Sequence, residues 1–398
     1  MEYIKSGLKY GAHNYKPILD IVIERGKGKY LYDVKNTRYL DFLAGYSSVN
    51  QGHIHPKISK VVKNQVNKLT MTSRAFYNKY LPEYQEYMNK IFGYEKLLPM
   101  NSGVEAAETS IKLARRFGYI NKEIMPNKAE ILVARDNFWG RSIAAISSST
   151  DPKSYLNFGP YVPNFIKIPY NNIEVLENHL KINKNIVAYM LEPIQGEAGI
   201  IVPDDGYLKK VRELCDKYNV LMICDEIQTG LGRTGKMLAS DYDGIKPDIL
   251  LLAKSLSGGF MPISAILCDD KIMLNIKAGE HGSTFGGNPI ASVVAMESVK
   301  VIIEEGMIEN SYNMGLYMRN KIENIIKKKK VDVKIRGKGL MIGIEFSEKI
   351  KVEDFIRYMG ENKILCNSTK RNTARITPPL IINKEDIDKF SYYFEKFI

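Results

Sequence analysis

The 398-residue chain carries a formal net charge of +12, with 44% hydrophobic and 26% charged residues. This composition is ordinary for a globular enzyme of two or three folding units, and no apolar run approaches the roughly 20 residues that a membrane span needs. Because the lysines are spread along the whole chain, the charge favours solvated helix faces over a nucleic-acid surface, and it would help to attract dicarboxylate substrates.

The four cysteines are scattered, form no CxxC pair, and lie at Cys215, Cys224, Cys268 and Cys366. The first ten residues lack the apolar core of a signal peptide and the Arg- and Ser-rich character of a transit peptide. A transit peptide already removed would leave no trace. We therefore expect a reducing, cytoplasmic setting.

Along the chain, the secondary-structure pattern changes twice. The opening residues alternate β-like runs, at 30–33 and 39–42, with turns. From about Pro56 helices alternate with short strands, for which the candidates are 131–134, 187–191, 220–224, 249–253 and 263–268. Several of these strands are apolar on both faces, as in a mainly parallel sheet covered by helices on each side. From about Pro289 helices dominate, with a β-like piece at 339–346. The pattern predicts an α/β fold followed by a smaller α+β domain.

Two of the predicted strands run directly into residues that can carry chemistry. The strand at 220–224 precedes Asp225, and the strand at 249–253 precedes Lys254. The carboxyl ends of parallel strands are the usual place for a ligand. A lysine that ends a buried strand is costly as an ammonium but suits Schiff-base chemistry as a neutral amine, although a lone lysine is more often a surface residue. A buried aspartate can keep the ring nitrogen of a pyridoxal cofactor protonated, or it can simply cap a turn.

A phosphate site is predicted where a helical run begins at residue 106. Ser102 and Glu105 form a capping-box pattern, and Gly103 would let an anion approach the backbone. Free amides and the helix dipole favour an anion at such a helix start. On this motif alone, a plain capped helix is an equally good interpretation.

A competing motif lies at 230–235, which matches the dinucleotide-binding pattern G-x-G-x-x-G. Its glycines begin five residues after the strand ends, and 236–247 has no apolar helical stripe, so the context argues against a nicotinamide cofactor. His53 and His55 are spaced for one face of a strand, but no further ligand cluster indicates a metal.

Several long segments, in order, resemble the class III, fold type I aminotransferases that use pyridoxal phosphate. They cover nearly the whole chain, at 10–15, 47–53, 137–141, 192–199, 225–230, 281–289 and 375–380. The resemblance implies a large domain with a seven-stranded, mainly parallel sheet covered by helices, and a smaller C-terminal domain. We expect an N-terminal segment at 1–48 that contributes to the active site and a dimer, the large cofactor-binding domain at 49–283, and the small domain at 284–398.

The same resemblance assigns cofactor residues. Lys254 would link covalently to the cofactor, and Asp225 would face its ring nitrogen. Gln228 would bond the ring hydroxyl, while Phe138 would stack on the ring face. The phosphate would be held by Ser102, Gly103 and Val104, and by Thr284 of the neighbouring subunit, so a homodimer is implied.

The substrate residues resemble those of family members that transfer the δ-amino group of L-ornithine to 2-oxoglutarate in a ping-pong reaction. Ornithine reacts at its δ-amine and glutamate at its α-amine, so one pocket must accept two charge patterns. Arg375 would bind the α-carboxylate of glutamate, and Glu197 would mask that arginine while ornithine is bound. Arg141 with Tyr15 would hold the distant carboxylate of ornithine, and Tyr46 would favour ornithine over other ω-amines.

The chain departs from the family pattern at 253–255, where Ala-Lys-Ser replaces Gly-Lys-Ala, and at 366–373, near the substrate arginine. Two alternatives stay open. A sister enzyme acting on N-acetylornithine or 4-aminobutyrate would differ around Tyr15 and Tyr46. A basic nucleic-acid-binding protein on a degenerate enzyme fold is a more remote alternative, against which Lys254 and Asp225 argue. We expect no metal, nucleic-acid or membrane partner.

Overall fold

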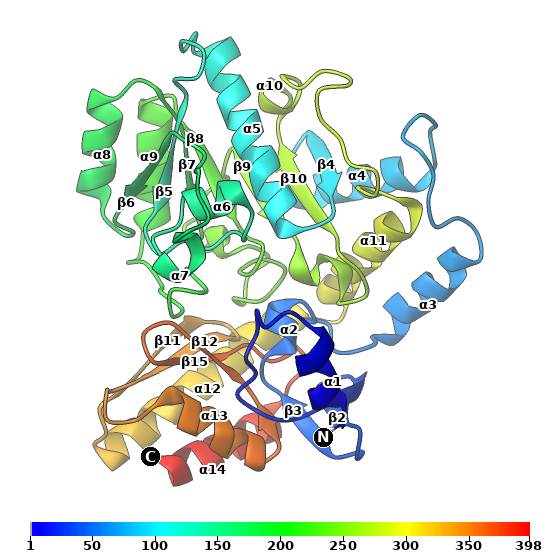
Figure 1. Cartoon of the computed structure of the whole chain (residues 1–398), viewed down its shortest axis with the longest axis vertical. Helices are drawn as coiled ribbons and strands as arrows, with labels where there is room; N and C mark the ends of the chain where they lie inside the picture. Colours follow the sequence, from blue (N-terminus) through cyan, green and yellow to red (C-terminus); the bar gives the residue numbers. More distant parts are fainter. Residues whose placement is uncertain (1) are drawn as a thin grey trace.

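The computed structural model describes residues 2–398 and contains a large seven-stranded sheet, which lies in the upper half of Figure 1. Its strands, in spatial order, are β4 (Lys96–Met100), β10 (Ser264–Cys268), β9 (Ile249–Leu252), β8 (Leu221–Asp225), β7 (Ile186–Leu191), β5 (Glu130–Ala134) and β6 (Phe165–Ile168). All are parallel except β10, which runs antiparallel to both of its neighbours. The predicted α/β fold and all five predicted strands are confirmed, whereas β4 and β6 were not predicted.

Helices cover both faces of this sheet because successive side chains of a strand point to opposite faces. On one face, Ile131, Ile223 and Leu251 pack with α5 (Gly103–Asn121). On the other face, Leu132 and Met222 pack with α8 (Ile173–Ile182) and α9 (Tyr207–Lys217). The same second face continues under α4 (Tyr80–Phe92) and α11 (Pro289–Glu304), the latter of which also packs on α3 (Pro56–Val66). Strands buried on both faces are the reason for the continuous apolar runs in the sequence.

Two smaller four-stranded sheets complete the fold. The first joins β1 (Ile23–Lys27), β2 (Tyr30–Asp33), β3 (Arg38–Asp41) and the short β13 (Ile364–Leu365). The second has the order β11 (Val333–Lys338), β12 (Met341–Phe346), β15 (Thr373–Ile376) and β14 (Asn367–Thr369). It packs with α12 (Met307–Lys329), α13 (Val352–Glu361) and α14 (Lys384–Phe397). Of the C-terminal strands, only β12 was anticipated, by the β-like piece at 339–346.

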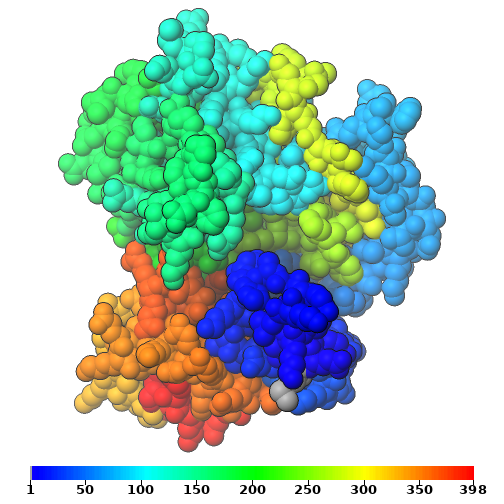
Figure 2. Space-filling view, in the orientation of Figure 1, coloured from blue at the N-terminus to red at the C-terminus, as the bar shows by residue number. Residues whose placement is uncertain are grey.

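The N-terminal segment (blue) lies against the C-terminal part of the chain (orange and red) in Figure 2, and both lie below the large sheet in the view of Figure 1. The contact is made through β13, which pairs in parallel with β3. The predicted domain boundaries after residues 48 and 283 stay predictions. The remaining elements are α1 (Glu2–Tyr10), α2 (Ala44–Ser47), α6 (Ile143–Ser147), α7 (Pro152–Tyr155), α10 (Asp270–Met273) and the 3-10 turns η1 (Ala239–Tyr242) and η2 (Lys254–Ser257). Within residues 2–398, no helix has both the length and the apolar character to cross a membrane.

Candidate active site

A cavity of about 660 Å³ lies at the edge of the large sheet where the parallel strands end. Its walls come from the segments that follow β4, β5, β7, β8 and β9, together with residues 259–263, which lead into β10. Eight of the sequence-predicted site residues line it, namely Ser102, Gly103, Val104, Phe138, Glu197, Asp225, Gln228 and Lys254. The position agrees with the expectation that ligands bind at the carboxyl ends of parallel strands.

Asp225 and Lys254 meet in this cavity because they end neighbouring strands, β8 and β9. Burial raises the pKa of Asp225 to about 6, although the amide of Ile227, 3.0 Å from Oδ1, and the charge of Lys254 partly oppose the rise. Burial lowers the pKa of Lys254, against the opposing charge of Glu197. Lys254 also has a φ of 47°, a left-handed backbone that is strained for a lysine. The site thus favours a neutral amine beside a buried carboxyl group.

The start of α5 is built to hold an anion. Ser102 caps the helix by accepting from the amide of Glu105 at 3.3 Å, and the Glu105 carboxylate accepts from the amide of Ser102 at 2.7 Å, which confirms the capping box. This exchange leaves the amides of Gly103 and Val104, at the first turn, without a partner inside the helix. A Cβ at Gly103 would lie only 3.0 Å from Ile227, so glycine keeps the approach open. The donors suit a phosphate group.

Phe138 and residues of the loop that follows β8 both line the cavity. Phe138, half-exposed, follows β5 and contributes its ring to the wall. Gln228 packs so closely on Gly196 that a Cβ there would come within 1.8 Å of its amide oxygen. A pyridoxal cofactor requires a pocket that surrounds its ring with an aromatic side chain, a buried carboxyl group, an amide and a lysine. These residues fit that group.

Arg375, on β15 of the small C-terminal sheet, forms an ion pair with Glu197, which lines the cavity. The arginine side chain is only 1% exposed, and its guanidinium lies 4.8 Å from the ring centroid of Tyr46. Burial alone would raise the pKa of Glu197. The charge and hydrogen bond of Arg375, together with the charges of Lys254 and Arg141, outweigh burial, so this pKa lies below its ordinary value. The structure therefore brings together Glu197, Arg375 and Tyr46.

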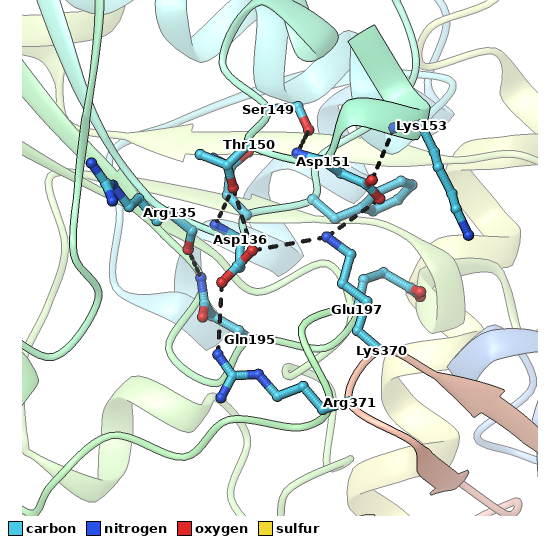
Figure 3. Close-up of polar contacts among 12 residues, drawn as sticks. Arg135, Asp136, Ser149, Thr150, Asp151, Lys153, Gln195, Glu197, Lys370 and Arg371 are labelled. Atoms are coloured by element: carbon cyan, nitrogen blue, oxygen red, sulfur yellow. Dashed lines mark hydrogen bonds and ion pairs between the residues drawn. The ribbon is translucent and has the colours of Figure 1, made fainter. Parts of the chain in front are cut away.

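The hairpin that leads into β15 is tied to the large domain by further polar contacts (Figure 3). The Lys370 ammonium lies 3.3 Å from Asp151 and 3.9 Å from Asp136, and the Arg371 guanidinium lies 3.7 Å from Asp136. Thr369 donates its hydroxyl to the backbone oxygen of Glu197 at 2.7 Å. The segment at 366–373, which departs from the family pattern, thus touches the loops that carry the site.

Five of the expected residues are not among those that line the cavity. Two of them, Arg375 and Tyr46, border it through Glu197, and the other three are Tyr15, Thr284 and Arg141. Tyr15 is 73% exposed on the N-terminal segment, and Thr284 is exposed on the loop before α11. Arg141 is also exposed, with its guanidinium 5.7 Å from the ring of Phe138, and its charge contributes to the lowered pKa of Glu197. Their predicted roles in substrate binding and in a shared site stay predictions.

One site residue received no role in the sequence reasoning. Glu192 follows β7 directly, and its carboxyl oxygens accept from the amides of Phe138 at 3.1 Å and Gly196 at 2.9 Å. Burial and the nearby Asp225 raise the pKa of Glu192 to about 8. The rule that picked out Asp225, a polar residue at the end of a buried parallel strand, would also have found Glu192. The side chain ties the loop of Phe138 to the loop of Glu197.

Comparison with known proteins agrees with this geometry. The family model described as aminotransferase class-III matches residues 10–398. The chain therefore belongs to the class III aminotransferases, the family that uses pyridoxal phosphate, as its residues suggested.

Within that family, its relatives point to a narrower group. A probable mitochondrial ornithine aminotransferase of Caenorhabditis elegans is 52% identical over 381 residues, which is 96% of this chain and 89% of the relative. The crystal structure of ornithine aminotransferase from Toxoplasma gondii matches with a TM-score of 0.97 at 42% identity, covering 99% of this chain and 94% of the other. An acetylornithine aminotransferase from Elizabethkingia anophelis is also similar, with 45% identity, a TM-score of 0.91 and coverage of 100% and 98%.

Proposed function

We propose that this chain transfers the δ-amino group of L-ornithine to 2-oxoglutarate, giving glutamate 5-semialdehyde, which cyclises spontaneously, and glutamate. The observation that carries the proposal is the ion pair between Glu197 and Arg375 beside Lys254. While Glu197 stays paired with it, Arg375 cannot bind the carboxylate of a substrate that reacts at its distal amine. When Glu197 moves away, Arg375 can bind the carboxylate of a substrate that reacts at the adjacent carbon. Relatives named as ornithine aminotransferases, over most of the chain, support the same substrate.

The cofactor would be held by two groups of residues. The amides of Gly103 and Val104, with Ser102, suit its phosphate, while Phe138 and Gln228 suit its ring and Asp225 its ring nitrogen. When bound, pyridoxal phosphate supplies an aldehyde that takes up amino groups and a protonated ring that withdraws electrons from the reacting carbon.

In this proposal, Lys254 moves the protons. Since burial lowers its pKa, its Nζ atom could accept a proton from the reacting carbon of the amine substrate as a general base. With the cofactor bound, the same atom could then donate that proton to the cofactor's aldehyde carbon as a general acid. For ornithine the proton comes from the δ-carbon, and for glutamate from the α-carbon. Asp225 would supply the negative charge that keeps the ring nitrogen of the cofactor protonated. Trp139, Ala253 and Ile263, which line the cavity, limit the access of water.

The two half-reactions would use the charged residues differently. With ornithine, Glu197 keeps Arg375 neutralised, and Arg141 with Tyr15 binds the distant α-carboxylate. With 2-oxoglutarate, the substrate α-carboxylate replaces Glu197 on Arg375, because a guanidinium can bind a carboxylate through two parallel hydrogen bonds. Tyr46 would set the preference among amines from its place against Arg375.

The site would be completed by a second copy of the chain. Thr284 is exposed and lies on a loop outside the cavity of its own chain, and the side chain of Phe285 beside it is 59% exposed. Phe76 and Tyr77 are also exposed aromatic residues. Exposed aromatic groups of this kind favour a protein interface, here a homodimer in which Thr284 reaches the partner's phosphate site.

The test compares the amines that this family distinguishes. Purified protein should absorb visible light, lose that absorption with ornithine and regain it with 2-oxoglutarate. Turnover of ornithine, N-acetylornithine and 4-aminobutyrate is then measured with 2-oxoglutarate as acceptor. We expect the highest kcat/KM with ornithine, and failure on ornithine alone would overturn the proposed substrate.

A second candidate is activity on N-acetylornithine, because the Elizabethkingia anophelis structure is as similar as several ornithine aminotransferases. N-acetylornithine keeps the distal amine and the carboxylate but carries an amide in place of the α-amine. Preference for it in the same assay would favour this candidate without changing the cofactor residues.

We also propose a reducing compartment, and within that class the cytoplasm. The four cysteines are all free and buried in the structure. Several relatives carry the word mitochondrial in their names. Fractionation of cells that make the full protein would distinguish the two locations.

A further inference from the structure

Tyr46 is carried by a turn with an unusual backbone. Four consecutive residues, Ala44, Gly45, Tyr46 and Ser47, have positive φ angles of 48°, 55°, 58° and 68°. The turn labelled α2 is therefore left-handed in its φ angles. For L-residues other than glycine, each such position costs on the order of 1–2 kcal/mol. Three of these four residues are not glycine, so the surrounding structure must hold the turn in place.

The buried carboxylate of Asp41, at the end of β3, supports the start of this turn. Its side chain is 2% exposed, and one oxygen, Oδ1, accepts from the amides of Leu43 at 2.8 Å and Ala44 at 2.9 Å. The other oxygen, Oδ2, lies 2.7 Å from Nε2 of His53. Through these three polar contacts, Asp41 joins the turn to His53, which lies 12 residues after Asp41 in the sequence.

His53 is itself fixed in place. Its backbone forms an isolated bridge with Gly28, by hydrogen bonds of 2.7 and 2.9 Å, which ties it to the turn between β1 and β2. A Cβ at Gly26 would lie 2.8 Å from the His53 Cβ, so the imidazole fits closely over β1. The N-terminal sheet thus provides a rigid base for the histidine and, through Asp41, for the left-handed turn.

The start of the turn is also attached to the strand that carries Arg375. Thr377, just after β15, donates its amide to the oxygen of Phe42 at 2.8 Å and its hydroxyl to the oxygen of Leu43 at 3.0 Å. Tyr46 then meets Arg375 at 4.8 Å and accepts at its hydroxyl from Asn367 at 3.1 Å. The Tyr46 ring is therefore positioned by the contacts at the start of its turn and by contacts of its own side chain.

We propose that Asp41 and His53 are positioning residues for amine selection. Their contact holds the left-handed turn so that the Tyr46 ring lies against Arg375 at the entrance for the substrate amine. Neither Asp41 nor His53 lines the cavity. Their turn is linked to the site through Tyr46, whose ring lies against Arg375, the partner of Glu197. This inference rests on the proposed function, in which Tyr46 favours ornithine over other ω-amines.

The experiment measures selectivity rather than rate alone. The ratio of kcat/KM for ornithine to kcat/KM for 4-aminobutyrate is determined for the full-length enzyme, His53→Ala and Tyr46→Ile, and for the double variant. His55→Ala is the matched control, since His55 is two residues away and contacts Glu305 at 3.1 Å instead of the turn. Loss of a contact to a charged group should lower the ratio about tenfold in His53→Ala, and the control should keep it unchanged.

If the pair acts through Tyr46, the double variant should show no further loss beyond Tyr46→Ile, because the two substitutions remove one interaction. A reduced ratio in Tyr46→Ile together with an unchanged ratio in His53→Ala would overturn the inference and leave the proposed function intact. An unchanged ratio in Tyr46→Ile would instead refute Tyr46 as selector, and the inference with it. Absence of any ornithine turnover in the unsubstituted enzyme would refute the proposed function itself.

A second variant tests whether the change in selectivity comes from a loss of folding. Asp41→Asn keeps an oxygen that can accept from the turn amides but removes the charge that faces His53. We expect it to fold, as monitored by its melting temperature, and to lower the selectivity ratio as His53→Ala does. If both variants fail to fold, the pair serves folding alone and the positioning role is overturned.

Discussion

The guanidinium of Arg375 and the carboxylate of Glu197 pair across the junction between the small C-terminal sheet and the large sheet. The arginine side chain is 1% exposed, whereas that of glutamate is 34% exposed. A buried cation without a partner is costly, and Glu197 neutralises Arg375 here. In the proposed function, a substrate carboxylate would take the place of Glu197. Because the glutamate is the more accessible partner, it is the one that can move away. The pair thus explains how one cavity could serve two kinds of substrate.

We predict that Glu197→Gln shifts the enzyme from ornithine toward α-amino acids. A free guanidinium would bind the ornithine α-carboxylate and orient the wrong amine toward Lys254. The rate of the ornithine half-reaction should fall at least about tenfold, while that with glutamate should be kept or rise. Rapid-mixing absorbance measurements of each half-reaction provide the test. The control is Glu395→Gln, whose partner Lys328 lies in an exposed pair on the last helices. Equal losses in both half-reactions would contradict the masking role.

The raised pKa of Asp225 predicts how the stability of the cofactor-free protein changes with pH. Below about pH 4 this carboxyl is protonated in both the folded and unfolded chain. Between about pH 4 and 6 the unfolded chain loses the proton and the folded chain keeps it, so stability falls as the pH rises. Moving the pKa from 3.8 to about 6 corresponds to about 3 kcal/mol of unfolding free energy.

The measurement is urea unfolding of the cofactor-free protein and of Asp225→Asn, across that pH range. The stability difference between the two should grow from about pH 4 to 6 and then level off. With cofactor bound, a protonated ring nitrogen would favour the ionised carboxylate, and the advantage of asparagine should disappear. Parallel pH profiles for the two cofactor-free proteins would show that Asp225 does not carry the effect.

The central sheet could be predicted because its strands are buried on both faces and therefore read as apolar runs. The same signal located Asp225 and Lys254, each at the point where such a run ends. It missed β6, whose residues are mostly half-buried, and β14, which is three residues long. Strands at the edge of a sheet or of such length leave little apolar pattern in the sequence.

The substrate side of the site could not be derived from local pattern. Arg375 and Glu197 are 178 residues apart, and each alone resembles a solvated surface charge. Their contact depends on how the small sheet docks on the large one, which only the family resemblance anticipated. The left-handed turn at 44–47 had no sequence signal beyond one glycine, because its stability comes from Asp41 and from distant Thr377.

The ion pairs around Lys370 predict a salt-sensitive contribution to substrate binding (Figure 3). These side chains are partly exposed, so each pair should contribute no more than about 1 kcal/mol. Lys370→Asp should raise KM for 2-oxoglutarate less than tenfold, mainly at low ionic strength. The exchanged pair, Lys370→Asp with Asp136→Lys, should recover part of the loss. The control Lys328→Asp alters an exposed pair away from the cavity and should leave KM unchanged. A loss that is independent of salt and is not recovered by the exchange would contradict an electrostatic origin.

The proposed sharing of sites predicts that two defective chains can complement each other. Thr284→Ala should weaken cofactor retention about 10- to 100-fold, as expected for loss of a hydrogen bond to a charged group, and Lys254→Ala should be inactive. A heterodimer of the two contains one site with both Lys254 and the partner's Thr284, so at limiting cofactor it should recover activity. Ser283→Ala is the matched control, because Ser283 accepts from Asn101 of its own chain at 2.8 Å. In a heterodimer of Ser283→Ala with Lys254→Ala, any defect caused by Ser283→Ala should persist. The only chain that supplies Lys254 in this heterodimer is the one that lacks Ser283. Activity of the Thr284→Ala heterodimer no higher than the mean of the two homodimers would show that the threonine acts within its own chain.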